Sequence, residues 1–205
     1  MLNVKYAVFG RLDNNCYLIT DEKSGEAALI DCTEDSEKMR EFIGDADLKY
    51  ILLTHGHFDH IGGVKGIKEM TGAQLAVSKE DSPMLGSGKL SLAAFCGEHH
   101  INSSADIILS DGDIINLGES EIRVMSTPGH TRGGVCYICD DKLFTGDTLF
   151  YCSCGRTDFP GGSAVEIIAS LEKLAALKGD YTVYPGHDRQ SNLDFERKNN
   201  PYMNR

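Results

Sequence analysis

The sequence predicts an α/β fold built in layers. Apolar runs of strand length recur along the 205 residues, and segments with helical spacing of apolar residues lie between several of them. No internal repeat, low-complexity tract or linker separates one part from another. Because a chain of this length can bury one sizeable core, we expect a single domain over residues 1–205.

The first half opens with strands. The expected strands cover residues 4–20, 26–32, 48–53 and 74–78, the first of them interrupted by a turn at residues 13–15. A helix is expected over residues 36–43, with Gly44 at its end. A second helical period runs from Ile61 to Ile67 despite the glycines between them.

Residues 80–104 show no firm period. Glycines with serine and proline nearby predict a loop-rich insert that could cover a pocket. The insert contains His99 and His100. We interpret both as surface histidines, because two adjacent residues rarely face one site.

The second half repeats the pattern of strand and polar loop. The expected strands cover residues 107–109, 121–125 and 135–139. A helix is predicted to begin at Ser163, whose side chain can form a capping box with Glu166, and to end at Gly179. Its buried stripe would consist of Ile167, Ile168, Leu171, Leu174 and Ala175. A short helix and tail are expected over residues 192–205.

Residues 54–63 carry the strongest chemical signal. They follow a predicted buried strand and place His55, His57, Asp59 and His60 within six positions. Neutral imidazole and carboxylate are ligands of zinc and similar divalent ions. Isolated histidines are usually surface or core residues, but four metal-capable side chains so close together are rarely a coincidence.

Three later loops each add one candidate ligand: His130, Asp147 and His187. Each loop follows a predicted strand, and a glycine precedes each ligand. Glycine adopts backbone conformations that cost other residues energy, so it can aim the next side chain inward. Together with the first cluster, these loops predict a metal centre at the ends of several strands.

Composition narrows the class of protein. Hydrophobic residues make up 41% and charged residues 25% of the chain, as in ordinary globular proteins. The net charge of −11 argues against a nucleic-acid partner, and the apolar runs are too short to span a membrane. No secretory leader is visible and the seven cysteines are scattered, so we expect a cytoplasmic location.

The candidate ligands and their flanking residues resemble the metallo-β-lactamase-fold hydrolases. Residues 59–63, 127–131 and 146–150 are similar to the glyoxalase II (hydroxyacylglutathione hydrolase) branch, especially its small bacterial members. The resemblance implies an αββα four-layer sandwich, in which helices flank two mixed β-sheets. It also implies that a separate C-terminal helical substrate domain, present in full-length glyoxalase II, is missing here.

The resemblance assigns every candidate ligand. It implies that one metal is held by His55, His57 and His130, and a second by Asp59, His60 and His187, with Asp147 bridging the two. The expected cofactors are two divalent ions, most simply zinc, with iron or manganese as alternatives. Antibiotic-cleaving members often have a cysteine in place of the bridging aspartate, so Asp147 argues against β-lactamase activity.

We expect this centre to hydrolyse a thioester, such as a 2-hydroxyacyl thioester of glutathione or a similar thiol. A hydroxide bridging the metals would attack the carbonyl, with Asp59 and Asp147 as the catalytic carboxylates. A thiol leaving group has a pKa near 8.5 and needs little protonation. A small-molecule thioester is therefore the expected partner, and the sequence leaves the oligomeric state open.

Two further questions stay open at the level of sequence. Residues 154–159 resemble the persulfide dioxygenases, in which His55, His130 and Asp147 would hold a single iron. Tyr151 and Arg156 are candidate substrate contacts, although Arg156 could instead pair with a neighbouring acid such as Asp158. Cys152 and Cys154, which are nearby, could equally be packing residues.

Overall fold

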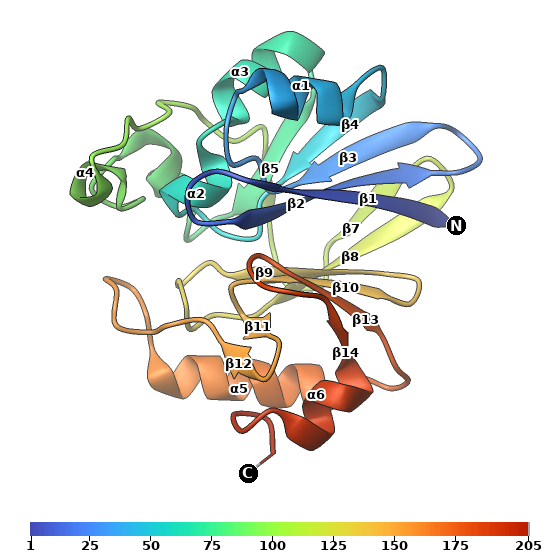
Figure 1. Cartoon of the computed structure of the whole chain (residues 1–205), viewed down its shortest axis with the longest axis vertical. Helices are drawn as coiled ribbons and strands as arrows, with labels where there is room; N and C mark the ends of the chain where they lie inside the picture. The colour runs from blue at the N-terminus through green and yellow to red at the C-terminus, as the bar shows by residue number, and fades with distance from the viewer. Residues whose placement is uncertain (205) are drawn as a thin grey trace.

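Two six-stranded sheets lie face to face in the computed structural model, which describes residues 1–204 (Figure 1). The first sheet follows chain order and contains β1 (Leu2–Phe9), β2 (Asn14–Asp21), β3 (Glu26–Ile30), β4 (Asp47–Leu52), β5 (Gln74–Ser78) and β6 (Ile107–Leu109). The second has the order β14-β13-β10-β9-β8-β7 and contains β7 (Ile114–Leu117), β8 (Ser120–Ser126), β9 (Val135–Cys139), β10 (Lys142–Gly146), β13 (Thr182–Pro185) and β14 (Ser191–Asn192). Both sheets mix parallel and antiparallel pairs.

Some of the helices cover the outer faces of the sheets, and others lie at the end of the first sheet. They are α1 (Glu37–Ile43), α2 (Phe58–Ile61), α3 (Val64–Thr71), α4 (Ala93–Cys96), α5 (Ala164–Ala175) and α6 (Leu193–Asn199), with a 3₁₀ helix η1 (Ser82–Gly86) and a small hairpin of β11 (Leu149–Phe150) and β12 (Ser153–Cys154). Helices α1 and α3 lie outside the first sheet, whereas α5 and α6 lie outside the second (Figure 1). None of the helices among residues 1–204 is long and apolar enough to cross a bilayer.

Three hydrophobic clusters fill the three interfaces between these four layers. One joins α1 and α3 to the first sheet through residues such as Met39 and Ile67, and another joins the two sheets through Tyr17 and Phe144. The third packs α5 and α6 against the second sheet, with Leu171 fully buried. Burial of apolar surface on both faces of each sheet confirms the predicted αββα sandwich.

The first strand boundary differs from the prediction. The turn occupies residues 10–13 rather than 13–15, because Asn14 already pairs with Phe9 in the β1–β2 ladder. Asn15 is also buried, and its side chain donates hydrogen bonds to the carbonyl oxygens of Pro185 and Asp188. These asparagines therefore have tertiary partners that outweigh their preference for turns.

Two predicted helices also differ in extent. The period from Ile61 to Ile67 is divided between α2 and α3 at Gly62 and Gly63. A Cβ atom at Gly62 would come within 2.3 Å of the Thr33 carbonyl oxygen, so the close backbone approach requires glycine there.

The helix that starts at Ser163 was predicted to reach Gly179 but ends at Ala175. Its cap at Ser163 is as predicted, because the serine side chain accepts a hydrogen bond from the Glu166 backbone N–H. At the other end, the Arg197 guanidinium of α6 donates to the carbonyl oxygens of Ala175 and Gly179. These bonds satisfy groups that a longer helix would have satisfied itself.

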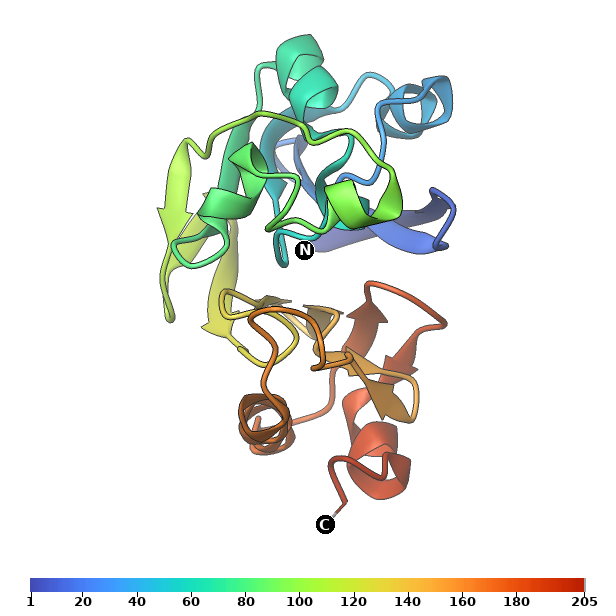
Figure 2. The ribbon, with the colours of Figure 1, turned by 90° about the vertical axis from the view of Figure 1, so that its left-hand side faces the viewer.

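The insert of residues 80–104 forms η1 and α4 and projects beside α2 (Figures 1 and 2). It is attached to the loop of candidate ligands: the Phe58 N–H donates to the Ser91 carbonyl oxygen at 2.9 Å. A Cβ at Gly56 would meet the Met84 side chain at 2.7 Å, which shows how closely η1 packs on that loop. His99 and His100 are exposed, as predicted.

Candidate metal centre

All seven candidate ligands lie at one end of the two sheets. His55 and His57 follow β4, and α2 carries Asp59 and His60. The other ligands, His130, Asp147 and His187, follow β8, β10 and β13. The two sheets therefore contribute to one centre from loops that lie as far apart in the chain as His55 and His187.

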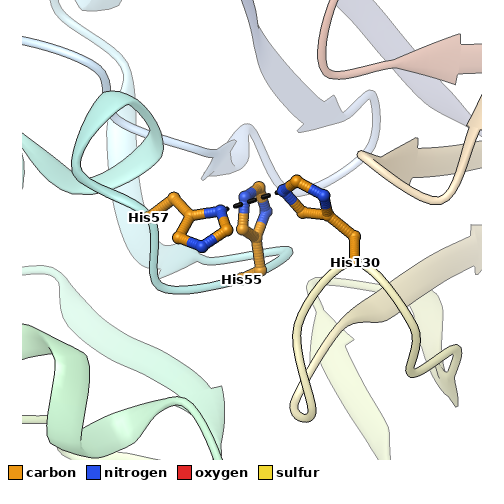
Figure 3. A group of neighbouring side chains, drawn as sticks. All are labelled: His55, His57 and His130. Atoms are coloured by element: carbon orange, nitrogen blue, oxygen red, sulfur yellow. Dashed lines mark hydrogen bonds between the residues drawn. The ribbon is translucent and has the colours of Figure 1, made fainter. Parts of the chain in front are cut away.

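The ligand atoms fall into overlapping groups. Within each group they lie within 4.8 Å of one another, and the groups are His55/His57/His130, His55/His60/Asp147 and Asp59/His60/His187. In Figure 3 the three imidazoles of the first group point toward one another, with His57 Nδ1 2.9 Å from His130 Nε2. The Asp147 carboxylate lies 3.4 Å from both His60 Nε2 and His130 Nε2, so it reaches both ends of the cluster.

Glycines before the ligands allow this convergence. Strands β10 and β13 are parallel, and a register shift after Phe144 pairs Gly146 with Pro185. The next residue, Gly186, lies so close to the centre that a Cβ would be 2.5 Å from Asp147 Oδ1. A larger residue would push the Asp147 and His187 loops apart, so the requirement at Gly186 is steric. The positive φ values that the sequence pattern predicts occur at the other two glycines, Gly129 and Gly146.

Backbone carbonyl groups fix the orientation of two imidazoles. His130 Nδ1 lies 2.7 Å from the Arg156 carbonyl oxygen, and His187 Nδ1 lies 2.9 Å from that of Leu12. A carbonyl oxygen only accepts, so each Nδ1 must carry the hydrogen. In the neutral ring the Nε2 lone pair is then directed into the centre, which is the usual arrangement of a metal-binding histidine.

Asp31 orients two more imidazoles, that of His60 directly and that of His55 through the Thr54 hydroxyl. Its carboxylate lies 2.8 Å from His60 Nδ1 and accepts a hydrogen bond from the Thr54 hydroxyl at 2.8 Å. Because that hydroxyl hydrogen is used, the Thr54 oxygen can only accept from His55 Nδ1, 3.1 Å away. His55 Nε2 is buried and has no partner among the described residues.

Burial and neighbouring charges shift the pKa values of the candidate ligands in different directions. Burial and the neighbouring imidazoles hold the pKa of His55 well below its usual value and lower that of His57 to about 3. Burial also disfavours charge on His60, but the carboxylates of Asp31, Asp59 and Asp147 outweigh it and raise the pKa of His60. Burial would raise the pKa of Asp147, yet the surrounding imidazoles keep it below its usual value.

This donor set fits divalent cations. Imidazole lone pairs and carboxylate oxygens point at common centres, and His55 Nε2 and Asp147 Oδ1 are buried without a hydrogen-bond partner in residues 1–204. Buried polar atoms are normally paired, and an unpaired one is costly. Cations at these positions would satisfy them with ligand types that zinc, iron and manganese accept.

Three supporting residues escaped the sequence analysis. Asp31 orients His60, and Asp81 joins two ligand loops by accepting from Gly56 N, Gly133 N and the Thr131 hydroxyl. Asn14 directs its amide nitrogen at Asp59 Oδ2, 2.9 Å away. Asp31 lies inside the strand expected over residues 26–32, where an acidic residue among apolar ones is its one signal, whereas Asp81 and Asn14 lie in stretches interpreted as loop or turn.

The candidate substrate residues are placed differently. Arg156 lines a cavity beside the centre, whereas Tyr151 stacks on Phe195 at a centroid distance of 5.2 Å and is not among the residues of that lining. Cys154 also lines the cavity, and Cys152, with a φ of +50°, occupies the turn between β11 and β12. Arg156 and Cys154 therefore line the cavity, and Tyr151 does not.

A family model described as the metallo-beta-lactamase superfamily matches residues 9–187. The chain belongs to this superfamily. Its members are mostly hydrolases, and their fold binds divalent metals. The matched segment contains all seven candidate ligands.

Some curated relatives of this superfamily member carry functional names. Hydroxyacylglutathione hydrolase GloC of Haemophilus influenzae is 33% identical over 99% of both chains. The probable polyketide biosynthesis zinc-dependent hydrolase PksB of Bacillus subtilis is 32% identical, over 85% of this chain and 72% of its own.

Solved structures share the whole fold. The BLEG-1 B3 metallo-beta-lactamase superposes with a TM-score of 0.92 and 28% identity, covering 100% of both chains. TTHA1623 in a di-iron-bound form has a TM-score of 0.86 and 30% identity, covering 97% of this chain and 100% of its own. ETHE1 from Myxococcus xanthus has a TM-score of 0.81 and 29% identity, covering 97% of this chain and 83% of its own.

Proposed function

We propose that this protein is a metal-dependent thioester hydrolase. The observation that carries the proposal is the convergence of seven donor side chains, five of which line the floor of a cavity of about 700 Å³, a size that suits a small molecule. The relationship to GloC over nearly the whole chain supports a thioester as the substrate. The proposed partner is therefore a small-molecule thioester.

The proposed centre holds two divalent cations. His55, His57 and His130 would bind one, and Asp59, His60 and His187 the other, with Asp147 between them. Zinc is the simplest choice, because PksB is named as a zinc-dependent hydrolase, and iron is the alternative suggested by the di-iron form of TTHA1623. When bound, such cations polarise a carbonyl oxygen and lower the pKa of a water molecule.

The side chains around the cavity suit a thiol leaving group. Asp59 and Asp147 are its only lining carboxylates among residues 1–204, and the lining contains no lysine. Nearby imidazoles lower the pKa of both aspartates against the effect of burial, so both stay ionised near neutral pH. A thiolate departs without a strong proton donor, whereas an amine would require one.

A second candidate function is oxidative. The similarity to ETHE1 covers 97% of this chain, and residues 154–159 resemble the persulfide dioxygenases. In that case His55, His130 and Asp147 would hold one iron, and dioxygen would oxidise a persulfide. The Asp59, His60 and His187 group would then stay without a cation, which favours hydrolysis.

Metal analysis and two substrates separate these functions. We expect two ions per chain in protein purified without added metal, and release of thiol from S-lactoylglutathione or another acyl thioester. His60→Ala or His187→Ala should lose about one ion and most turnover, whereas the exposed control His99→Ala should lose neither. One iron per chain, with oxygen uptake on a persulfide that survives both substitutions and no thioester turnover, would overturn the proposal.

A β-lactam should be tested as a third substrate in the same assay, because the chain is similar to the BLEG-1 metallo-beta-lactamase. Because the donor set includes Asp147 rather than a cysteine, we expect no significant cleavage of a chromogenic cephalosporin. Cleavage of the cephalosporin at a rate comparable with that of the thioester would contradict this expectation.

A further inference from the structure

The cavity beside the ligand cluster is strongly apolar away from its floor. Six large apolar side chains form most of its wall: Leu12, Phe58, Leu92, Phe95, Phe150 and Phe159. They come from the β1–β2 turn, α2, the insert, the β11–β12 hairpin and the loop before α5. We call this set the apolar wall.

The wall is held in place by contacts outside the ligand cluster. The Ser91 carbonyl oxygen accepts from Phe58 N, and the Gly88 carbonyl oxygen accepts from Ala94 N at 2.8 Å. Between these bonds, Leu92 is 6% exposed although its φ of +67° is unfavourable for leucine. The insert is therefore folded over the loop of ligands and fixed there.

Two side chains of the wall are exposed. Phe95 is 69% exposed and Leu12 47%, whereas the Phe150 and Phe159 rings that line the same cavity are half-buried. A large exposed aromatic group at the mouth of an apolar cavity is typical of a surface that an apolar ligand covers. The occupant should therefore lie against Phe95 with its other end at the aspartates and histidines of the floor.

The residues around the cavity provide few positive charges to bind an anionic ligand. Apart from histidines, Arg156 is the only cationic residue of the lining within residues 1–204. Its guanidinium donates two hydrogen bonds to Asp158 at 2.6 Å and lies 4.0 Å from the Phe159 ring centroid. These bonds lower the pKa of Asp158 to about 2, so the pair stays ionised at neutral pH.

Arg11 is neutralised in the same way beside the cavity. Its side chain pairs with Glu98 at 3.3 Å, donates to the Cys96 carbonyl oxygen at 2.8 Å and lies 5.9 Å from the Phe58 ring centroid. Both arginines thus extend the apolar wall while acidic neighbours balance their charges. A thiol with two carboxylates, such as glutathione, would find no unpaired cation here.

We propose that the cavity binds a thioester through an uncharged hydrocarbon chain, which packs on Phe95, Phe150 and Phe159 while the thioester group reaches the floor. This inference rests on the proposed function and narrows its substrate class. The chain can belong to the acyl group or to the thiol. Glutathione thioesters of small polar acids are then poor substrates.

Hydrolysis of two substrate series tests the proposal on metal-loaded protein. One series lengthens the acyl chain from acetyl to octanoyl on N-acetylcysteamine, a small uncharged thiol. The other keeps the acetyl group and lengthens an uncharged alkyl thiol. We expect kcat/KM to rise about fourfold per methylene in one series until the cavity is filled, and every member of that series to exceed S-lactoylglutathione.

Binding gives a readout that does not depend on turnover. Ketone analogues, in which a methylene replaces the thioester sulfur, should bind with the same dependence on chain length in calorimetry. The chain has no tryptophan, so Phe95→Trp provides a single fluorophore whose emission should shift to shorter wavelength when the analogue binds.

Variants of the wall supply the controls. Phe95→Ala should weaken binding of the octanoyl analogue about fivefold, with less effect on the acetyl analogue, because only the longer chain reaches that ring. Ile114→Ala, which truncates an exposed apolar side chain on β7 away from the cavity, should change neither. Asp158→Asn should release Arg156 and improve S-lactoylglutathione hydrolysis about threefold relative to the octanoyl substrate.

The outcomes separate the two proposals. Thioester turnover without any dependence on chain length, and with glutathione preferred, would overturn the apolar-chain proposal and leave the hydrolase function intact. Length-dependent binding of the ketones without any thioester turnover would support the cavity assignment and overturn the chemistry. Neither binding nor turnover would overturn both.

Discussion

Both halves of the ligand cluster contain histidines, but the pKa values of these histidines are shifted in opposite directions. In the group of His55, His57 and His130, burial and mutual repulsion hold the pKa of His55 and His57 low. In the group of Asp59, His60 and His187, nearby carboxylates raise the pKa of both histidines despite burial. The surroundings, rather than the imidazoles themselves, set their charge.

This difference has a consequence for metal binding. In the first group, the lowered pKa values of His55 and His57 leave neutral rings with lone pairs available near neutral pH. In the second group, protons on the histidines partly balance the aspartates until a cation replaces them. Binding at the second group should therefore release more protons and depend more strongly on pH.

Asp147→Ala should have the largest effect, because this carboxylate reaches both groups. We expect a loss of turnover of about 10³-fold, since its charge serves both cations. Metal analysis should show both ions weakened. Asp141→Ala, at an exposed aspartate on the adjacent β-hairpin, is the matched control. Near-normal activity with two ions bound would show that the two groups do not share this ligand.

Two supporting aspartates allow each half to be weakened separately. Asp31 contacts His60 of the second group directly and reaches His55 of the first only through the Thr54 hydroxyl. Asp81 joins the loops that carry His57 and His130 of the first group. Such supporting contacts typically change metal affinity by 10–100-fold. We expect Asp31→Asn to weaken mainly the second ion and Asp81→Asn mainly the first, as measured by competition with a chelator. Equal loss of both ions in both variants would show that the halves are not independent.

Replacing Asn14 should destabilise the metal-free protein more than the metal-loaded protein. Its amide nitrogen lies 3.2 Å from His60 Nε2 and 3.3 Å from His187 Nε2, while its Oδ1 is buried without a partner among the described residues. Asn14→Ala should lower the unfolding free energy of metal-free protein by about 2 kcal/mol, because a buried charge-assisted hydrogen bond is lost. The gain in Tm on adding metal should then be larger than in wild type. An equal drop in both states would contradict this role.

The smallest expected effect is the pH dependence of the metal-free protein. The pKa of His60 is raised on folding, so its stabilising ion pairs are fully present below the unfolded pKa of about 6.5 and are lost as pH rises through the folded value. Tm after chelation should therefore fall from pH 6 toward alkaline pH. His60→Gln should flatten this slope and His100→Gln should not. A Tm that rises over this range would contradict the assignment of charge.

Local sequence patterns indicate which side chains could form the centre and that strands and helices build a layered α/β fold. The order of the four layers follows from the resemblance to the metallo-β-lactamase-fold hydrolases. Ligands spaced by one or two residues, and single ligands after glycine, are local patterns that depend on backbone geometry. The apolar periods of the strands and of the helix at Ser163 are equally local. Each of these features could be predicted because neighbouring residues specify it.

The surroundings of those ligands depend on tertiary contacts. The sequence predicts Asn14 in a turn, yet it pairs with Phe9 in β2 and directs its amide at Asp59 and His187, which are distant in the chain. Helix α5 ends at Ala175, whose carbonyl oxygen accepts a hydrogen bond from Arg197 of α6. The apolar wall gathers side chains from five segments, and no spacing along the chain records that they meet. Contacts between distant residues depend on how the layers pack, and local patterns do not contain that information.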